Sequence, residues 1–238
     1  MIKKVYSTYE EMSLAAADIV SRQLNTNPES VFGLATGSTP LGLYAELVER
    51  YQKGELDFSR ARSFNLDEYY PMSKSHPQSY YYFMHENLFS KVNFASARLL
   101  DGETSDPSGE CEAYDAEIDT CGGIDLQILG IGLNGHIGFN EPAESYSVPT
   151  YLVNLTESTL TANSRFFRDG EVQPTSALTM GFGTIFNAKS ILLLISGASK
   201  APIAKKLFEG KIHVDVPACL LQLHPNVTVL LDKDAAGE

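Results

Sequence analysis

The stretch GIGLNGHIGFNEP, from Gly130 to Pro142, begins inside the apolar run DLQILGI (125–131) and decides between two kinds of α/β protein. Its first six residues form the pattern Gly-x-Gly-x-x-Gly, which is typical of dinucleotide-binding sites when a strand precedes it and a helix follows. The strand is expected, but Gly138 and Pro142 oppose a helix after the third glycine. A dinucleotide site needs that helix, because the pyrophosphate sits on its N-terminus. The stretch therefore predicts an irregular loop at the end of a strand and disfavours a dinucleotide.

Short apolar or β-branched runs recur on both sides of this stretch, separated mostly by segments with helical spacing. Strands that alternate with helices are typical of an α/β fold. We predict one domain over residues 1–238, built on an open, mostly parallel sheet with helices on both faces. The expected strands are VFGLA (31–35), RSFNL (62–66), DLQILGI (125–131), YLVNL (151–155), SILLLIS (190–196) and VTVLL (227–231). The apolar face of the helix after the first strand is expected at Leu41, Tyr44, Ala45 and Val48.

The composition excludes several classes of function. The net charge is -12, with 18 basic against 30 acidic residues, and no basic run marks a nucleic-acid site. The three cysteines are odd in number and form no Cys-x-x-Cys pair, so neither a disulfide framework nor a thiolate zinc site is expected. We expect no bound metal. Neither a signal peptide nor a membrane-spanning run is apparent, which favours a cytoplasmic protein without a membrane partner.

The loop expected after residues 125–131 carries polar side chains that suit proton transfer. A histidine exchanges protons near neutral pH, and a nearby carboxylate orients its imidazole and stabilises the charged form. The alternative is a glycine-rich turn whose asparagines cap backbone groups and whose histidine is merely hydrogen-bonded. The polar residues are Asn134, His136, Asn140 and Glu141.

A second loop, TGSTP (36–40), follows the strand at 31–35 and precedes a helix. Thr39 suits the N-cap of that helix and Pro40 its first position. Small residues here leave backbone N–H groups open at a helix N-terminus, which suits a phosphate. The alternative is an ordinary, well-capped helix. The candidate phosphate ligands are Thr36, Gly37, Ser38 and Thr39.

Two further strand ends carry charged residues. The strand at 62–66 leads into Asp67 and Glu68, which are either solvated loop residues or, for Asp67, a base. After the strand at 190–196, a helix is expected near Ser199, with Lys200 in its first turn. That is the unfavourable end of the helix dipole for a cation, which favours a bound anion. Because ligands of open α/β sheets bind outside the carboxyl ends of the strands, the four loops together predict acid/base chemistry on a small phosphorylated molecule.

Six motifs, in this order, make the sequence similar to the glucosamine-6-phosphate deaminases, also called glucosamine-6-phosphate isomerases, over nearly its whole length. The resemblance implies an enzyme that converts glucosamine 6-phosphate and water to fructose 6-phosphate and ammonia. It also implies a Rossmann-like sheet and no organic cofactor. The motifs are TGSTP, FNLDEYY, GIGLNGHIGFNEP, NSRFF, SGASKA and CLLQLHPN.

The resemblance also implies roles for individual residues. His136 would open the pyranose ring, with Glu141 and Asn134 orienting it and tuning its charge. Some relatives carry Asp in place of Asn134, so that Glu141 would supply most of the electrostatic support here. Asp67 would move a proton from C2 to C1 of the open-chain sugar. The phosphate would be held by Thr36, Gly37, Ser38, Thr39, Arg165 and Lys200.

Other implied properties concern motion, regulation and assembly. The segment at about 155–178 would be a mobile lid. The segment AESYSVPTYLVNLT (143–156) lacks the basic residues of allosteric relatives, so we expect no activation by N-acetylglucosamine 6-phosphate. A monomer or small homo-oligomer is expected rather than a hexamer. The alternatives are a 6-phosphogluconolactonase, which would need no base at Asp67, and a non-catalytic sugar-phosphate sensor, which would not use His136.

Overall fold

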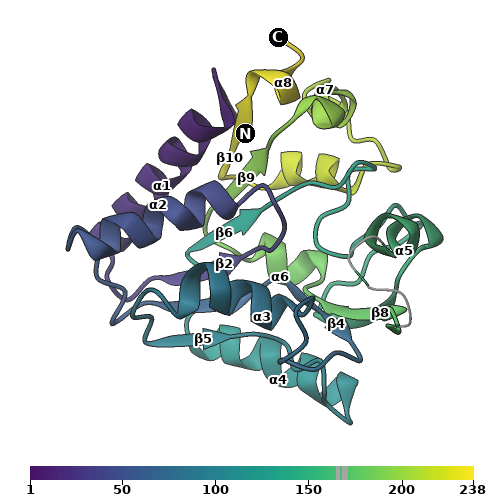
Figure 1. Cartoon of the computed structure of the whole chain (residues 1–238). Helices are drawn as coiled ribbons and strands as arrows, with labels where there is room; N and C mark the ends of the chain where they lie inside the picture. The colour runs from purple at the N-terminus through teal and green to yellow at the C-terminus, as the bar shows by residue number, and fades with distance from the viewer. Residues whose placement is uncertain (165–166, 168–170) are drawn as a thin grey trace.

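The computed structural model describes residues 1–164, 167 and 171–238 (Figure 1). Its central feature is a seven-stranded sheet in which every neighbouring pair of strands is parallel. This confirms the α/β fold and the mostly parallel sheet. In spatial order the strands are β1 (Ile2–Tyr6), β10 (Val227–Asp232), β9 (Ile191–Ile195), β6 (Leu126–Leu129), β2 (Val31–Leu34), β3 (Arg62–Asn65) and β5 (Ser96–Arg98).

Both faces of the sheet are buried, as β9 shows most clearly. Its side chains alternate between two hydrophobic clusters, with Ile191, Leu193 and Ile195 in one and Leu192 and Leu194 in the other. Burying such a side chain contributes about 1.5–3 kcal/mol, so a wholly apolar strand is stable only between two layers of helices. The predicted cover on both faces is therefore confirmed.

Different helices form the two layers. The first cluster is covered by α4 (Pro107–Thr120), α6 (Phe182–Phe186), α7 (Ala201–Leu207), α8 (Lys233–Ala236) and a 3₁₀ segment (Pro217–Leu223). The second is covered by α1 (Tyr9–Thr26), α2 (Leu41–Gln52), α3 (Tyr80–Met84) and the π-helical turn that continues it (His85–Phe89). Within the described ranges, no helix is both long and apolar enough to cross a membrane.

A second, antiparallel sheet of three strands corrects the prediction for residues 151–155. Those residues form β7 (Tyr151–Asn154), which pairs with β8 (Ser176–Thr179), which in turn pairs with β4 (Asp67–Tyr70). The side chains of β7 alternate between half-buried and exposed, as expected for a strand with one solvated face. The sequence prediction had also omitted β1, β4, β5 and β8.

The start of α2 differs from the prediction that Thr39 would cap it. The helix begins at Leu41, and no side chain of the 36–40 loop accepts a hydrogen bond from its first turn. Instead the Gly42 N–H donates to the Tyr9 hydroxyl at 2.7 Å, a partner from α1 that local sequence does not reveal. The predicted face is also shifted, since Ala45 is exposed and the buried residues are Leu43, Tyr44, Leu47 and Val48.

The order of strands places a topological switch between β2 and β6. From β2 the chain continues outward to β3 and β5, whereas from β6 it continues the opposite way to β9 and β10. Such a reversal leaves a crevice at the carboxyl ends of the two strands, where open α/β sheets bind ligands. The four loops singled out in the sequence follow β9, β6, β2 and β3, four neighbours in the sheet, so their predicted convergence is confirmed.

Candidate active site

The loop after β6 wraps around the imidazole of His136. A Cβ atom on Gly132 would lie 2.2 Å from Cε1 of His136, so only glycine lets the backbone pass this close to the ring. Gly135 has φ +84°, and a side chain there would also collide with Val216. No helix follows Gly135. The glycine pattern thus shapes a loop around a histidine, as the sequence predicted.

Asn134 is the nearest partner of His136. Its Oδ1 lies 2.7 Å from Nδ1 of the imidazole, whereas Oε1 of Glu141 lies 3.4 Å from the same nitrogen. Asn134 Oδ1 also accepts the backbone N–H of His136 at 3.2 Å. Because Oδ1 is only an acceptor, we assign the proton of the neutral ring to Nδ1, which leaves the lone pair on Nε2.

Glu141 is a buried carboxylate held by donors. Nδ2 of Asn134 donates to its Oε2, and the hydroxyl of Thr159 in α5 (Glu157–Ser164) donates to its Oε1. Burial alone would raise the pKa of Glu141, but the contacts with His136, Thr159 and Asn134 outweigh burial and lower that pKa to about 2. Glu141 therefore stays ionised at neutral pH and stabilises a positive charge on His136.

Gly138 brings this loop against β4. Its φ is +58°, and a Cβ there would lie 2.9 Å from Oγ1 of Thr179 and 3.4 Å from Oδ2 of Asp67. Thr179 is paired with Asp67 across the small sheet, and its hydroxyl accepts the Phe139 N–H at 3.2 Å. Asp67 and the loop that carries His136 are thus packed together at one edge of the sheet.

Asp67 occupies an environment unlike that of Glu141. Its side chain is buried, and the described part of the chain donates no hydrogen bond to its carboxyl group. Burial, and to a smaller extent the charge of Glu68, raise the pKa of Asp67 to about 8. A carboxyl group that exchanges its proton near neutral pH is suited to act as a general base.

The backbone of the 36–40 loop is open at Gly37 and Ser38. Gly37 has φ +98° with open space where a side chain would stand, and Gly37 and Ser38 are exposed while Thr36 and Thr39 are half-buried. The Tyr9 hydroxyl donates to the carbonyl oxygens of Ser38 and Thr39 at 3.2 and 3.0 Å, which fixes the loop from behind.

Lys200 lies at the junction of a 3₁₀ turn (Ala198–Lys200) and α7, one residue before the α-helix starts. Its Nζ donates to the carbonyl oxygen of Ile131 at 2.7 Å, which ties the loop after β9 to the loop after β6. Burial lowers the pKa of Lys200. Arg165, the other predicted cationic phosphate ligand, lies outside the described residues.

Comparison with known proteins identifies the family. Residues 7–230 match the family model described as glucosamine-6-phosphate isomerases/6-phosphogluconolactonase. The chain belongs to this family. Two relatives named glucosamine-6-phosphate deaminase share about half of their residues with it. The protein from Thermoanaerobacter pseudethanolicus is 53% identical over 96% of this chain and 91% of its own, and that from Halothermothrix orenii is 52% identical over 98% of both.

Two solved structures resemble the chain to different degrees. A structure described as a monomeric glucosamine-6-phosphate deaminase has a TM-score of 0.95 and 44% identity, covering 100% of this chain and 99% of its own. The 6-phosphogluconolactonase of Trypanosoma brucei has a TM-score of 0.78 and 20% identity, covering 99% of this chain and 97% of its own. The second likeness shows the shared fold alone.

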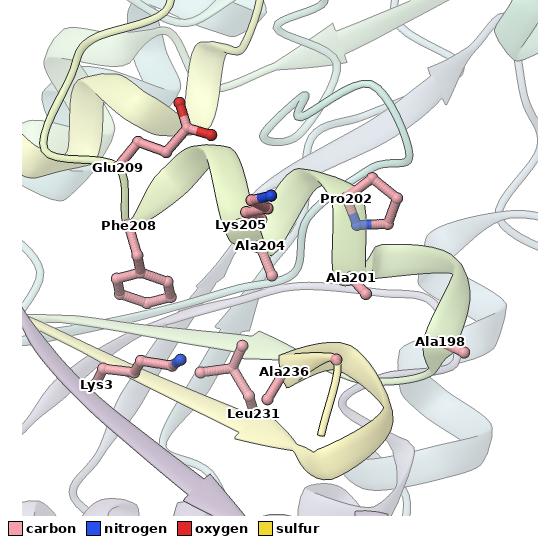
Figure 2. Close-up of a pocket in the computed structure, with 11 residues that line it drawn as sticks. Lys3, Ala198, Ala201, Pro202, Ala204, Lys205, Phe208, Glu209, Leu231 and Ala236 are labelled. Atoms are coloured by element: carbon pink, nitrogen blue, oxygen red, sulfur yellow. The ribbon is translucent and has the colours of Figure 1, made fainter.

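One groove of about 730 Å³ lies away from these family motifs, between β1, β10, α7 and α8 (Figure 2). The ammonium group of Lys3 stands 5.1 Å from the ring centroid of Phe208 there, and Leu231 and Ala236 line its floor. None of the predicted site residues that the structure describes lines this groove. The described residues also bring together no group of three or more His, Cys, Asp or Glu side chains that could hold a metal ion.

Sequence reasoning missed three residues that complete the site. Thr159 contacts Glu141 from a helix 18 positions further along the chain, and Thr179 pairs with Asp67 from a strand that was not predicted. Glu68 had been regarded as a solvated neighbour of Asp67, yet it is buried. Of these three residues, only Glu68 could have been recognised from the sequence. Successive side chains of a strand point to opposite faces, so in the strand-like segment DEYY the side chain of Glu68 points away from that of Asp67.

Proposed function

We propose that this protein is an enzyme that converts glucosamine 6-phosphate and water to fructose 6-phosphate and ammonia. The observation that carries this proposal is the buried carboxyl group of Asp67, with its raised pKa, packed against the loop of His136. Isomerisation of an amino sugar needs a base at C2 and an acid/base group at the ring oxygen, and these two residues supply both. The deaminases named above are about 50% identical to this chain, which supports the same conclusion.

His136 opens the sugar ring. Its Nε2 takes the proton of the O1 hydroxyl and delivers it to the ring oxygen O5, breaking the C1–O5 bond and leaving an aldehyde at C1. During this shuttle the imidazole is transiently positive, and the ionised Glu141, 3.4 Å from Nδ1, stabilises that charge. Asn134 holds the ring through Nδ1 and thereby keeps Nε2 directed at the substrate.

Asp67 carries out the isomerisation. It abstracts the proton from C2, and the electron pair is accepted by the C1 carbonyl, so no cofactor is needed as an electron sink. The same carboxyl returns the proton to C1, and one proton passes from the amino nitrogen to O1, which gives a ketimine at C2 beside a hydroxyl group at C1. Water then adds to the ketimine and ammonia leaves, which gives fructose 6-phosphate. A positioned base of this kind contributes typically 10²–10⁴-fold to the rate.

The phosphate group of the substrate binds between the 36–40 loop and Lys200 in this proposal. Open backbone at Gly37 and Ser38 suits phosphate oxygens, and Lys200 supplies a cation from the neighbouring loop. Arg165 is proposed as a further ligand. The segment at about 155–178 is proposed as a lid, because its helix α5 already contacts Glu141 through Thr159.

The proposal extends to assembly and location. The chain forms a single domain over residues 1–238 and acts in the cytoplasm in this proposal. It does so as a monomer or small homo-oligomer, which the relative described as monomeric supports. We propose that N-acetylglucosamine 6-phosphate does not activate the enzyme. Sigmoidal kinetics that this compound abolishes would contradict that part of the proposal.

Ammonia release from purified protein and glucosamine 6-phosphate tests the function. We expect ammonia and fructose 6-phosphate in equal amounts from the wild type, and no ammonia above background from Asp67→Asn or His136→Gln. The lactonase is measured in parallel with 6-phosphogluconolactone as substrate. Rapid lactone hydrolysis that survives Asp67→Asn, without any ammonia release, would replace the deaminase by the lactonase.

A further inference from the structure

Glu68 stands next to the proposed base on the opposite face of β4. Successive side chains of a strand point to opposite faces, so Asp67 faces the site while Glu68 faces the layer that contains α3. Glu68 is 1% exposed, which is unusual for a carboxylate. No cation among the described residues forms an ion pair with it, although the charge of Lys74 acts on it from further away. We propose that Glu68 is a positioning residue for Asp67: its buried carboxylate fastens β4 to the first turn of α3 and holds a negative charge beside the base. This inference rests on the proposed function.

The carboxylate of Glu68 accepts backbone N–H groups on both of its oxygens. Oε1 accepts from Tyr69 and Tyr80, each at 2.9 Å, and Oε2 accepts from Tyr81 at 2.8 Å. The N–H groups of Tyr80 and Tyr81 open α3 and have no partner within the helix. One side chain therefore joins the strand that carries Asp67 to the start of a helix 12 residues away, and bonds to an ionised acceptor are the stronger kind.

The helix held in this way also packs against the loop of the histidine. The ring of Tyr80 lies 4.9 Å from that of Tyr69 and 6.1 Å from that of Phe139, between ring centroids. Phe139 follows Gly138, where an added Cβ atom would lie 3.4 Å from Oδ2 of Asp67. Releasing Glu68 would loosen α3, and with it one wall of the pocket in which Asp67 and the loop of His136 meet.

The charge of Glu68 acts on Asp67 through the buried interior, where both side chains lie. Burial raises the pKa of Glu68 to about 7, while the N–H groups of Tyr80, Tyr81 and Tyr69 and the charge of Lys74 act in the opposite direction. No described residue donates a hydrogen bond to the carboxyl group of Asp67. The negative charge of the neighbouring Glu68, together with burial, raises the pKa of Asp67 and makes it a stronger base.

Further titratable groups among the described residues lie on the elements around this pair. Burial raises the pKa of Tyr44 on α2, Tyr80 on α3 and Tyr114 on α4, which keeps these three neutral near pH 7. The remaining groups are Tyr69 on β4, Lys74 in the segment before α3, and His136 with Glu141 in the loop after β6.

Two variants test the charge of Glu68 and its grip on α3. Glu68→Gln removes the charge and keeps the length and one acceptor oxygen, while its NH2 group cannot accept the N–H that the other oxygen accepts. The acid limb of kcat/KM for ammonia release should then move down by roughly one pH unit. Glu68→Asp keeps the charge but is one methylene too short to reach α3, so kcat should fall about tenfold with the acid limb in place. Glu55→Gln, at an exposed position, is the matched control and should change neither.

The outcomes decide the inference in each case. An acid limb that stays in place in Glu68→Gln overturns it. If Glu68→Gln does not fold, Glu68→Asp is the variant that tests the inference. A wild-type kcat in Glu68→Asp would then contradict the proposal that Glu68 holds α3 in place. If the wild type releases no ammonia, the proposed function fails on its own. The carboxyl titration of Asp67, followed by ¹³C NMR in ligand-free wild type and Glu68→Gln, then still shows whether Glu68 raises that pKa.

Discussion

Two buried carboxyl groups, Asp67 on β4 and Glu141 in the loop after β6, differ mainly in the hydrogen-bond donors around them. They are 6% and 9% exposed, yet the pKa of Asp67 is raised to about 8 and that of Glu141 is lowered to about 2. Glu141 accepts from Asn134 and Thr159 and lies beside His136. No described residue donates a hydrogen bond to the carboxyl group of Asp67, and the negative charge of Glu68 raises its pKa further. Burial alone thus does not set the role of a carboxyl group. The hydrogen-bond donors around each carboxyl group have the larger influence: they suit Glu141 to be a fixed negative charge, and the lack of described donors suits Asp67 to be a base.

The largest expected effect is on catalysis by Asp67→Asn. Without the base at C2, kcat should fall by about 10³-fold or more while KM changes little, because the phosphate contacts lie elsewhere. Steady-state ammonia release measures both parameters. The control is Asp119→Asn, at an exposed position of α4, which should leave kcat unchanged. An Asp67→Asn enzyme within tenfold of the wild type would remove Asp67 from the chemistry.

Glu141→Gln should have the next largest effect, and it should depend on pH. The lowered pKa means that the ionised Glu141 stabilises the fold above about pH 4.5 and that this contribution is lost as the pH falls towards about 2. At pH 7 the variant should therefore lose at most about 3 kcal/mol of unfolding free energy, and the difference should vanish near pH 2. Urea unfolding at several pH values measures it, with Glu144→Gln in the same loop as control. A difference independent of pH would mean that packing, not charge, is lost.

The opposite sign is expected for stability in Asp67→Asn. A raised pKa means that folding favours the protonated form, so the contribution of Asp67 is fully present below about pH 3.8 and is lost as the pH rises through about 8. Asparagine never ionises, so the variant should be more stable than the wild type by about 1–3 kcal/mol at pH 7 and equal to it below pH 4. Thermal unfolding across this range provides the measurement. An inactive variant that is also less stable at pH 7 would contradict the raised pKa.

The smallest expected effect tests the link between α5 and Glu141. Thr159→Val removes the hydroxyl and keeps the shape, so Glu141 loses one of its donors, a change of about 1 kcal/mol. We expect kcat/KM to fall about fivefold, and the exposed Thr161→Val on the same helix should have no effect. Equal rates in the two variants would show that the position of α5 does not depend on this contact.

The sequence predicted where the polar loops meet better than it predicted the strands around them. The carboxyl ends of neighbouring parallel strands must meet at one edge of a sheet, so loops 36–40 and 130–142 could be placed together from their order alone. The antiparallel sheet was missed because β4 is only four residues long and begins with two acids, which resemble a solvated turn. β1 was missed because its sequence, IKKVY, is polar and mostly exposed.

Long-range contacts account for the rest of what the sequence could not show. The Tyr9 hydroxyl caps α2 from 33 residues away, and Thr159 reaches Glu141 from 18 residues away. Neither contact has a local pattern, because each depends on how helices pack and not on spacing within one element. The opposite pKa shifts of Asp67 and Glu141 likewise follow from donors that only the folded chain assembles.

The central claim is that Asp67 exchanges the C2 proton while His136 and Glu141 open the ring. The most direct measurement follows glucosamine 6-phosphate deuterated at C2 by NMR in the presence of Asp67→Asn. The account predicts that this variant accelerates interconversion of the α and β anomers as fast as the wild type does, while the deuterium stays at C2. Loss of the C2 deuterium at the wild-type rate would contradict the account, because a group other than Asp67 would then be the base.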